Sequence, residues 1–233
     1  MYTARRPRVP QPWKSSIKKE KKMALDAARK QQMVDMEMGS FYGVTATAKA
    51  FTNESAVYGG QIYRIFKDCG DKGAGAKAAA THDGVKAIKD AGVTIPTDLR
   101  IYCIGDNNAQ NRAFHRGQGW VKIAFVVLGG KAVVGGRADA VSATKLGGYA
   151  IPAISCIHEI GHCLHETSAG DDLYFGTGSI LSGAPVNANQ VSGYAAMTKK
   201  EFVAEVFASL ILGKTFNQAV MDEYRLYHGP VVP

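Results

Sequence analysis

The sequence predicts an α+β fold, in which a small mixed sheet precedes a mainly helical C-terminal subdomain. Two stretches rich in β-branched and aromatic residues, 98–104 and 121–128, come before two long helical patterns at 152–166 and 198–212. Strands that gather ahead of the helices, rather than alternating with them, are typical of this class. The chain has 233 residues and is 46% hydrophobic, which suffices to bury a substantial core.

The first 40 residues predict a basic arm and a helix. Residues 1–30 hold ten Lys or Arg and two acidic residues, so their charge of +8 equals that of the whole chain and the remainder balances to zero. Three early prolines favour an extended arm, and the Pro-free and Gly-free stretch 16–38 favours a helix. We expect residues 1–40 to precede a single domain over 41–233. The arm is either a solvated tail or a contact for an anionic partner (nucleic acid or lipid) or an export partner.

Local signals predict the elements that follow the arm. Gly and Pro residues bound most of these stretches, and the apolar residues between them follow either a helical or an extended pattern. The predicted elements are a short helix over 56–66, a helix over 76–91, strands over 98–104 and 121–128, and a further strand over 131–134 that forms a hairpin with the one before it.

Cysteine usage and hydropathy bear on the compartment. The four cysteines contain no C-x-x-C pair and predict free thiols packed as small hydrophobes: Cys69, Cys103, Cys156 and Cys163. The sequence contains neither a run of about 18 apolar residues nor an apolar stretch of the kind a signal peptide needs. We therefore expect a soluble protein that is either cytoplasmic or exported by a route independent of a signal peptide.

The most specific motif is His158-Glu159-Ile160-Gly161-His162, which spells H-E-x-x-H. Histidines at i and i+4 share one face of a helix, so both rings can present a nitrogen to one metal ion. Glu159 is turned about 100° from His158 and can serve as a general base without occupying the metal. A catalytic zinc has three protein ligands and one open position, so the motif requires a third donor elsewhere.

Two residues close to the motif are poor third ligands. Position 168, where a related zinc-peptidase pattern has a third histidine, is Ser168. His165 lies on the same helical face as His158 but about 10 Å further along the axis, so the rings cannot easily converge on one ion. We expect the His165 side chain either to support a metal ligand from outside or to line the cleft.

A better donor lies in the helical pattern over 198–212. Glu201 and Glu205 share the side opposite its apolar stripe, and neither has a basic residue four positions later. Thr198-x-x-Glu201 also matches a capping box, which would use the Glu201 carboxylate on the backbone at the helix start. In that case Glu205 would bind the metal instead.

Taken together, these motifs resemble those of the gluzincin peptidases of the anthrax lethal factor and Pro-Pro endopeptidase group. The shared features are the H-E-x-x-H motif, the sequence Glu201-Phe-Val-Ala-Glu205 beginning 39 residues after His162, and Tyr194 seven residues before Glu201. The resemblance covers roughly residues 80–227. It implies a zincin-like fold and a zinc ion bound by His158, His162 and Glu201, with Glu205 supporting a ligand from outside.

The resemblance also implies an activity. A zinc-dependent endopeptidase would use Glu159 to take a proton from the attacking water and Tyr194 to donate a hydrogen bond to the developing oxyanion. A peptide or protein substrate would bind in extended form on an edge strand above the active-site helix, for which 121–128 is our candidate. A toxin-like or effector peptidase delivered into another cell is a context that the group makes plausible.

A second class of function follows from the basic arm. A nucleic-acid or scaffold-binding protein would use the arm for contact and keep zinc for structure alone. A structural zinc normally has four protein ligands, which here would require His165 to join the site.

Overall fold

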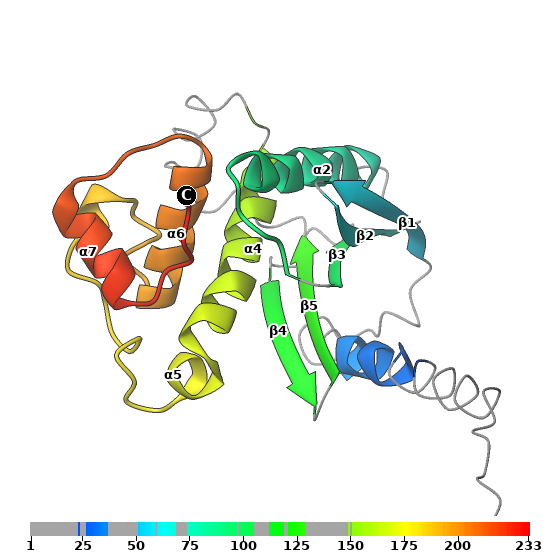
Figure 1. Cartoon of the computed structure of the whole chain (residues 1–233), viewed down its shortest axis with the longest axis horizontal. Coiled ribbons are helices and arrows are strands. Elements are labelled where there is room, and N and C mark those ends of the chain that lie inside the picture. The colour runs from blue at the N-terminus through cyan, green and yellow to red at the C-terminus, as the bar shows by residue number, and fades with distance from the viewer. Residues whose placement is uncertain are drawn as a thin grey trace, which may run out of the picture.

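The computed structural model describes residues 23, 27–36, 51–58, 60–68, 74–96, 98–104, 112–118, 121–128, 149 and 151–233. A mixed sheet lies against one long helix, α4 (Ile151–Ala169), and the C-terminal helices lie on the other side of that helix (Figure 1). The strands are β1 (Phe51–Tyr58), β2 (Gln61–Asp68), β3 (Leu99–Cys103), β4 (Arg112–Gln118) and β5 (Val121–Leu128). The other elements are α2 (Ala74–Asp90), α5 (Asp171–Phe175), the 3-10 turn η2 (Ala188–Gln190), α6 (Lys199–Ile211) and α7 (Gln218–Leu226). The predicted α+β class is confirmed.

The five described strands have the order β1-β2-β3-β5-β4. β2, β3 and β5 run parallel to one another, whereas β1 pairs antiparallel to β2 at one edge and β4 pairs antiparallel to β5 at the other. The predicted helix over 76–91 and the strands over 98–104 and 121–128 are present as α2, β3 and β5. The strand predicted over 131–134 lies outside the described residues.

The prediction of a short helix over 56–66 is wrong, because this stretch belongs to the β1–β2 hairpin. In β2 the side chains alternate between the two faces, with Tyr63 and Ile65 buried and Ile62 56% exposed. Gly60, in the turn between the strands, has a φ of 76°, a conformation that side-chain-bearing residues rarely adopt. The pair Gly59-Gly60 between two apolar runs is a hairpin signal that the helical interpretation ignored.

The prediction that residues 121–128 form an edge strand is also wrong. β5 (Val121–Leu128) lies between β3 and β4, and its Val126 and Leu128 are buried. The edge of the described sheet on this side is β4, which the sequence analysis did not identify. A strand buried between two neighbours is typically rich in β-branched residues, as β5 is, whereas the polar sequence of β4 (RAFHRGQ) is typical of an edge.

α4 forms the centre of the core, with α2 and the sheet on one side and α6 on the other (Figure 1). Two glycines permit close helix contacts. A Cβ at Gly84 of α2 would lie 2.8 Å from the Ala153 carbonyl oxygen, and a Cβ at Gly161 would lie 2.8 Å from Phe207 Cδ1 of α6. The glycine inside the H-E-x-x-H motif therefore brings α6 against the face of α4 that carries the histidines.

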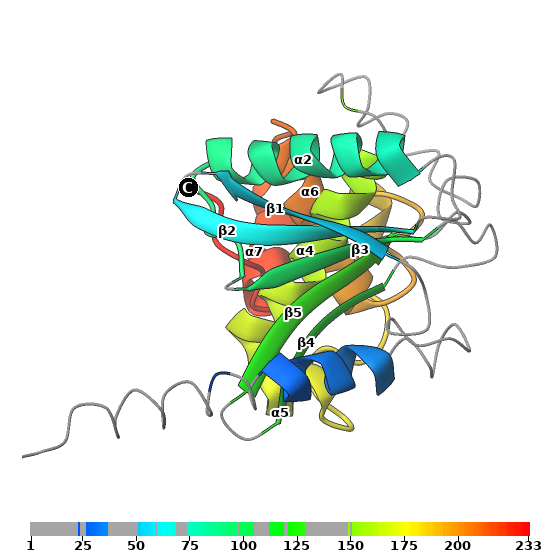
Figure 2. The same ribbon diagram turned by 90° about the vertical axis from the view of Figure 1, so that its right-hand side faces the viewer.

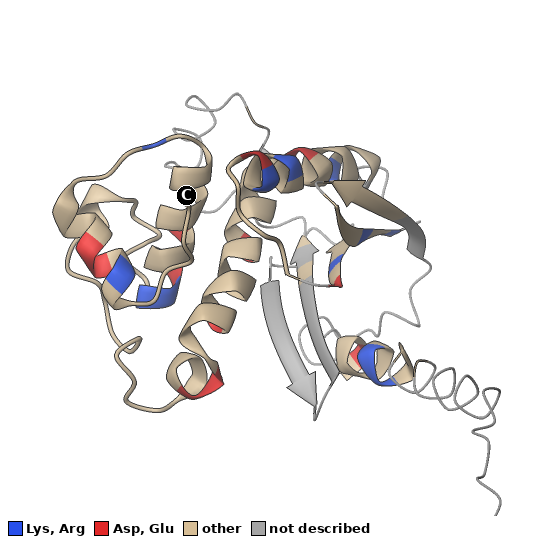
Figure 3. Ribbon diagram, viewed as in Figure 1, with Lys and Arg blue, Asp and Glu red and all other residues tan. Residues whose placement is uncertain are grey.

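The helix at 27–36 packs on the side of the sheet opposite α4 (Figure 2). Its Met33 and Val34 are buried, and Lys30 Nζ lies 2.5 Å from Asp98 Oδ2. Residues 1–22 of the predicted basic arm lie outside the described residues. Over the rest of the described chain, Lys and Arg alternate with Asp and Glu along α2 and around α7 (Figure 3), in keeping with the zero net charge after residue 30. None of the helices in the described ranges combines the length and apolar character needed to cross a bilayer.

Candidate metal site

His158 and His162 lie one turn apart near the middle of α4 and point to the same place. Their ring centroids are 4.8 Å apart and their Nε2 atoms 3.1 Å apart. His158 is 1% exposed, because α6 covers this side of the helix. The 3.6-residue period of an α-helix accounts for the shared direction, since residues at i and i+4 lie one above the other.

α6 brings the carboxylate of Glu201 to the same point. Its Oε2 lies 3.0 Å from His158 Nε2 and 3.3 Å from His162 Nε2. Thr198 is the N-cap of α6, and its hydroxyl accepts a hydrogen bond from the Glu201 backbone N–H. One half of the predicted capping box is thus formed, while the Glu201 carboxylate reaches the histidines.

The spacing of these three atoms fits a small cation. Donors that bind zinc tetrahedrally at about 2.0–2.1 Å lie about 3.3–3.4 Å from one another. The three distances in this cluster are 3.0, 3.1 and 3.3 Å. His158, His162 and Glu201 can therefore hold a metal ion, and no other group of three such residues that could do so occurs among the described parts of the chain.

Charge in the cluster favours a cation as well. Burial raises the pKa of Glu201, but the neighbouring His162 and His158 outweigh it and hold that pKa well below its usual range. The carboxylate is thus ionised at neutral pH, and it contributes a negative charge to a site whose other two donors are imidazole nitrogens.

Glu205, one turn after Glu201 in α6, contacts His158 from outside. Its Oε1 lies 2.8 Å from His158 Nδ1, and its Oε2 accepts a hydrogen bond of 3.0 Å from the Ser192 hydroxyl. The negative charge of Glu205 at this distance favours a proton on Nδ1, which leaves the Nε2 lone pair of His158 directed into the cluster. Ser192 was not identified from the sequence, because a serine in a loop has no spacing rule that relates it to Glu205.

The loop before α6 also carries Tyr194. Its ring is tilted 53° to the His158 ring, with centroids 5.8 Å apart, and the residue is half-buried. Glu159 lies between the two histidines on α4 and is 5% exposed. The structure thus places both expected catalytic residues beside His158, one in the same helix and one in the loop.

His165 does not line a cleft, which was one of its two expected positions. Its side chain is fully buried, and its Nε2 is 2.7 Å from the Tyr227 carbonyl oxygen, to which it donates a hydrogen bond. This bond ties α4 to the end of α7, so His165 neither lines a cleft nor reaches the cluster. His165, seven residues after His158, shares its helical face but lies further along the helix axis. It therefore packs against the end of α7 and not against the cluster.

Tyr174 of α5 makes a contact with the cluster that was not predicted from the sequence. It is buried, and its hydroxyl oxygen lies 3.3 Å from His162 Nδ1. No sequence pattern relates it to the motif, because the chain must turn between α4 and α5 to bring the ring back.

Because His165 is buried, we expect the free energy of unfolding to depend on pH in a specific way. Burial lowers its pKa from 6.5 to about 3, so between these values the unfolded chain binds a proton that the folded chain does not. Folding therefore loses stability as the pH falls below 6.5. Between pH 7 and 5.5, metal-free wild type should lose about 1 kcal/mol more of its unfolding free energy than His165→Gln, as measured by urea titration.

The matched control is His228→Gln, since His228 is exposed. This variant should show the pH dependence of wild type. If wild type and His165→Gln lost the same unfolding free energy between pH 7 and 5.5, His165 would not be held neutral by the fold.

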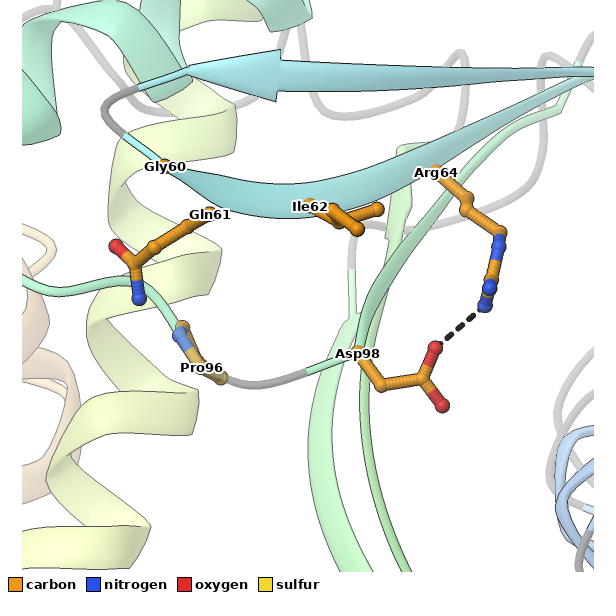
Figure 4. A pocket seen from close by; sticks show the side chains of 6 residues that line it. All are labelled: Gly60, Gln61, Ile62, Arg64, Pro96 and Asp98. Carbon is orange, nitrogen blue, oxygen red and sulfur yellow. Dashed lines mark hydrogen bonds and ion pairs between the residues drawn. The ribbon is translucent and has the colours of Figure 1, made fainter. Parts of the chain in front are cut away.

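A pocket elsewhere in the protein shares no residue with the cluster. It has a volume of about 390 Å³ and lies where β2 begins (Figure 4), lined by Gly60, Gln61, Ile62, Arg64, Pro96 and Asp98. Its polar groups already have partners, because Arg64 pairs with Asp98 and the Gln61 amide bonds the Ile95 backbone. The three described cysteines, Cys103, Cys156 and Cys163, are free and buried, as predicted.

Comparison of the chain with protein-family models, with curated proteins and with solved structures found no match in any of the three. Its function is therefore inferred from its own residues and their geometry.

Proposed function

We propose that this chain is a zinc-dependent endopeptidase of the gluzincin type, with His158, His162 and Glu201 as the metal ligands. The observation that carries the proposal is that the ligand atoms of three residues from two helices lie within 3.0–3.3 Å of one another. Two imidazoles and one carboxylate are the protein ligands of one type of open catalytic zinc site. In the described chain no fourth His, Cys, Asp or Glu joins them, which leaves a position for water.

The arrangement of the sheet supports the same proposal. β4 contacts α4 and pairs with a described strand, β5, on one side only. Among the described residues its other side has no strand partner, and its backbone N–H and C=O groups would there be available to an extended peptide that adds to the sheet beside the metal site. On this basis we propose a zincin-like fold, in which the antiparallel edge strand of a mixed sheet lies along the helix with the metal ligands.

Each residue of the site has a chemical task in this proposal. A zinc ion would polarise the scissile carbonyl and lower the pKa of a water molecule toward about 7. Glu159, next to the ligand His158, accepts the proton of the attacking water and passes it to the leaving amine. Glu205 holds His158 in the tautomer and orientation that ligation needs.

Tyr194 is assigned to the oxyanion that forms from the scissile carbonyl. Tyr194→Phe should keep the bound metal and reduce kcat at least tenfold, since one such donor contributes about 10² to 10³ in rate. Peptide hydrolysis under saturating substrate measures the effect. Tyr58→Phe, which removes a hydroxyl bonded to Asp90 on the protein surface, should leave kcat unchanged. A Tyr194→Phe enzyme with the kcat of wild type would return this tyrosine to a packing role.

The proposal is tested by digestion of a peptide library with the full chain, with cleavage products identified by mass spectrometry. We expect cleavage with zinc, none after chelation, and none with Glu159→Gln at the same concentration. Cleavage that persists in chelator, or equal cleavage by Glu159→Gln, would reject a zinc peptidase that uses this site.

The nucleic-acid or scaffold-binding alternative gains no support from the site. A closed structural zinc needs a fourth protein ligand, and the residue considered for that role, His165, is bonded to the Tyr227 carbonyl oxygen. The basic residues that would contact nucleic acid lie mainly in residues 1–22, outside the described residues.

A further inference from the structure

The two histidines of the cluster have different outer partners. His158 Nδ1 lies 2.8 Å from the Glu205 carboxylate, whereas His162 Nδ1 lies 3.3 Å from the hydroxyl oxygen of Tyr174. A neutral imidazole that binds a metal through Nε2 must carry its proton on Nδ1, and this proton needs an acceptor. In the described structure the Tyr174 oxygen is the acceptor within reach of His162 Nδ1.

The ring of Tyr174 is held from several sides, which fixes the position of its hydroxyl. The His165 ring meets it edge-on at 5.1 Å, and the Phe175 ring does so at 5.0 Å. The Lys200 ammonium lies 4.3 Å above its centroid, close enough for a cation–π interaction. Tyr174 is 8% exposed, so water does not freely replace its hydroxyl.

We propose that Tyr174 is a positioning residue for the metal site, whose hydroxyl accepts the Nδ1–H of His162 and so directs the Nε2 lone pair of that ring toward the metal. The inference rests on the proposed function only in taking His162 as a ligand. It also assigns His165 an indirect role, because the His165 ring, tied to Tyr227, supports the ring of Tyr174 rather than binding metal itself.

Removal of the hydroxyl leaves the Nδ1–H of His162, whose side chain is only 12% exposed, without this acceptor. The ring then populates the other tautomer or turns, and either change withdraws Nε2 from the metal. Loss of an outer partner of a metal-bound histidine typically weakens metal binding about 10- to 100-fold.

The test measures zinc affinity by competition with a chromophoric chelator, using the full chain as wild type, Tyr174→Phe, Tyr174→Leu and Tyr224→Phe. Tyr174→Phe removes only the hydroxyl and should bind zinc at least about tenfold more weakly than wild type. Tyr224→Phe is the matched control: this buried tyrosine donates a hydrogen bond to the Pro230 carbonyl oxygen at the C-terminal end. Its zinc affinity should lie within twofold of wild type.

A second measurement is independent of metal and of activity. Nitrogen chemical shifts of His162 in the metal-free, isotopically labelled protein report its tautomer, with the signal assigned by His162→Gln. Wild type should favour the Nδ1–H form, and Tyr174→Phe should shift the population toward Nε2–H.

The outcomes separate this inference from the proposed function. If Tyr174→Phe binds zinc as wild type does while Tyr174→Leu loses affinity, the residue acts by packing and the inference is overturned. An unchanged His162 tautomer in Tyr174→Phe overturns it as well. If Tyr174→Phe binds weakly but wild type cleaves no peptide, the inference stands and the peptidase proposal fails. If wild type binds no zinc, both the inference about Tyr174 and the proposed function are rejected.

Discussion

Glu201→Ala should lose stoichiometric zinc, whereas Glu205→Ala should keep it at reduced affinity. Glu201 Oε2 lies 3.0 and 3.3 Å from the two Nε2 atoms, so its removal leaves two protein ligands. Structural zinc binding in small domains contributes about 10–16 kcal/mol over four ligands, or about 2.5–4 kcal/mol for each. Loss of one ligand therefore weakens binding by at least about 10²-fold.

Glu205→Ala is the matched control, because the two glutamates lie one turn apart on the same helix. Glu205 contacts His158 through Nδ1, so its loss disturbs a ligand without removing one. We expect a 10- to 100-fold weaker affinity, with one zinc per chain still bound when the metal is in excess. Elemental analysis after gel filtration measures both variants. If Glu205→Ala alone lost zinc, the ligand assignment would be reversed.

Glu159→Gln should retain zinc and lose peptide hydrolysis by about 10²- to 10⁴-fold. The amide has nearly the volume of the carboxylate but cannot accept and return a proton, so the change removes general base and acid catalysis and little else. Glu159 is 5% exposed on α4, where a substitution of similar shape preserves the packing.

The control for this variant is its metal content and its unfolding midpoint, both of which should match wild type. Hydrolysis is followed on a peptide from the library digestion, at substrate concentrations above and below KM. Turnover within tenfold of wild type would remove Glu159 from the role of base.

Much of the candidate site was predictable because it depends on spacing within single helices. The i, i+4 relation of His158 and His162 and the N-cap at Thr198 follow from helix geometry alone. The choice between Glu201 and Glu205 could not be made from the residues themselves, because both lie on one side of α6. The packing of α6 against α4, made close by Gly161, brings Glu201 Oε2 to the Nε2 atoms and Glu205 to an Nδ1.

The contacts that were missed all depend on chain segments that meet only in three dimensions. Tyr174 reaches His162 through the turn into α5, Ser192 reaches Glu205 from the loop before α6, and His165 is fixed by a carbonyl oxygen at the end of α7. None of these has a local sequence signature.

The error in the predicted edge strand also arises from segments that meet only in three dimensions. The order of strands in a sheet depends on pairing between distant segments. The sequence of β5 alone therefore could not show that β4, and not β5, lies at the edge of the described sheet. The β1–β2 hairpin is different, because the Gly59-Gly60 pair was a local signal for it.

X-ray absorption at the zinc edge of the purified full chain is the most direct test of an open, three-ligand zinc site. We expect one zinc per chain, surrounded by nitrogen and oxygen atoms at about 2.0–2.1 Å, with the scattering of two imidazoles and room for one water. A third imidazole, a sulfur at about 2.3 Å, or a protein that binds no zinc would contradict the account.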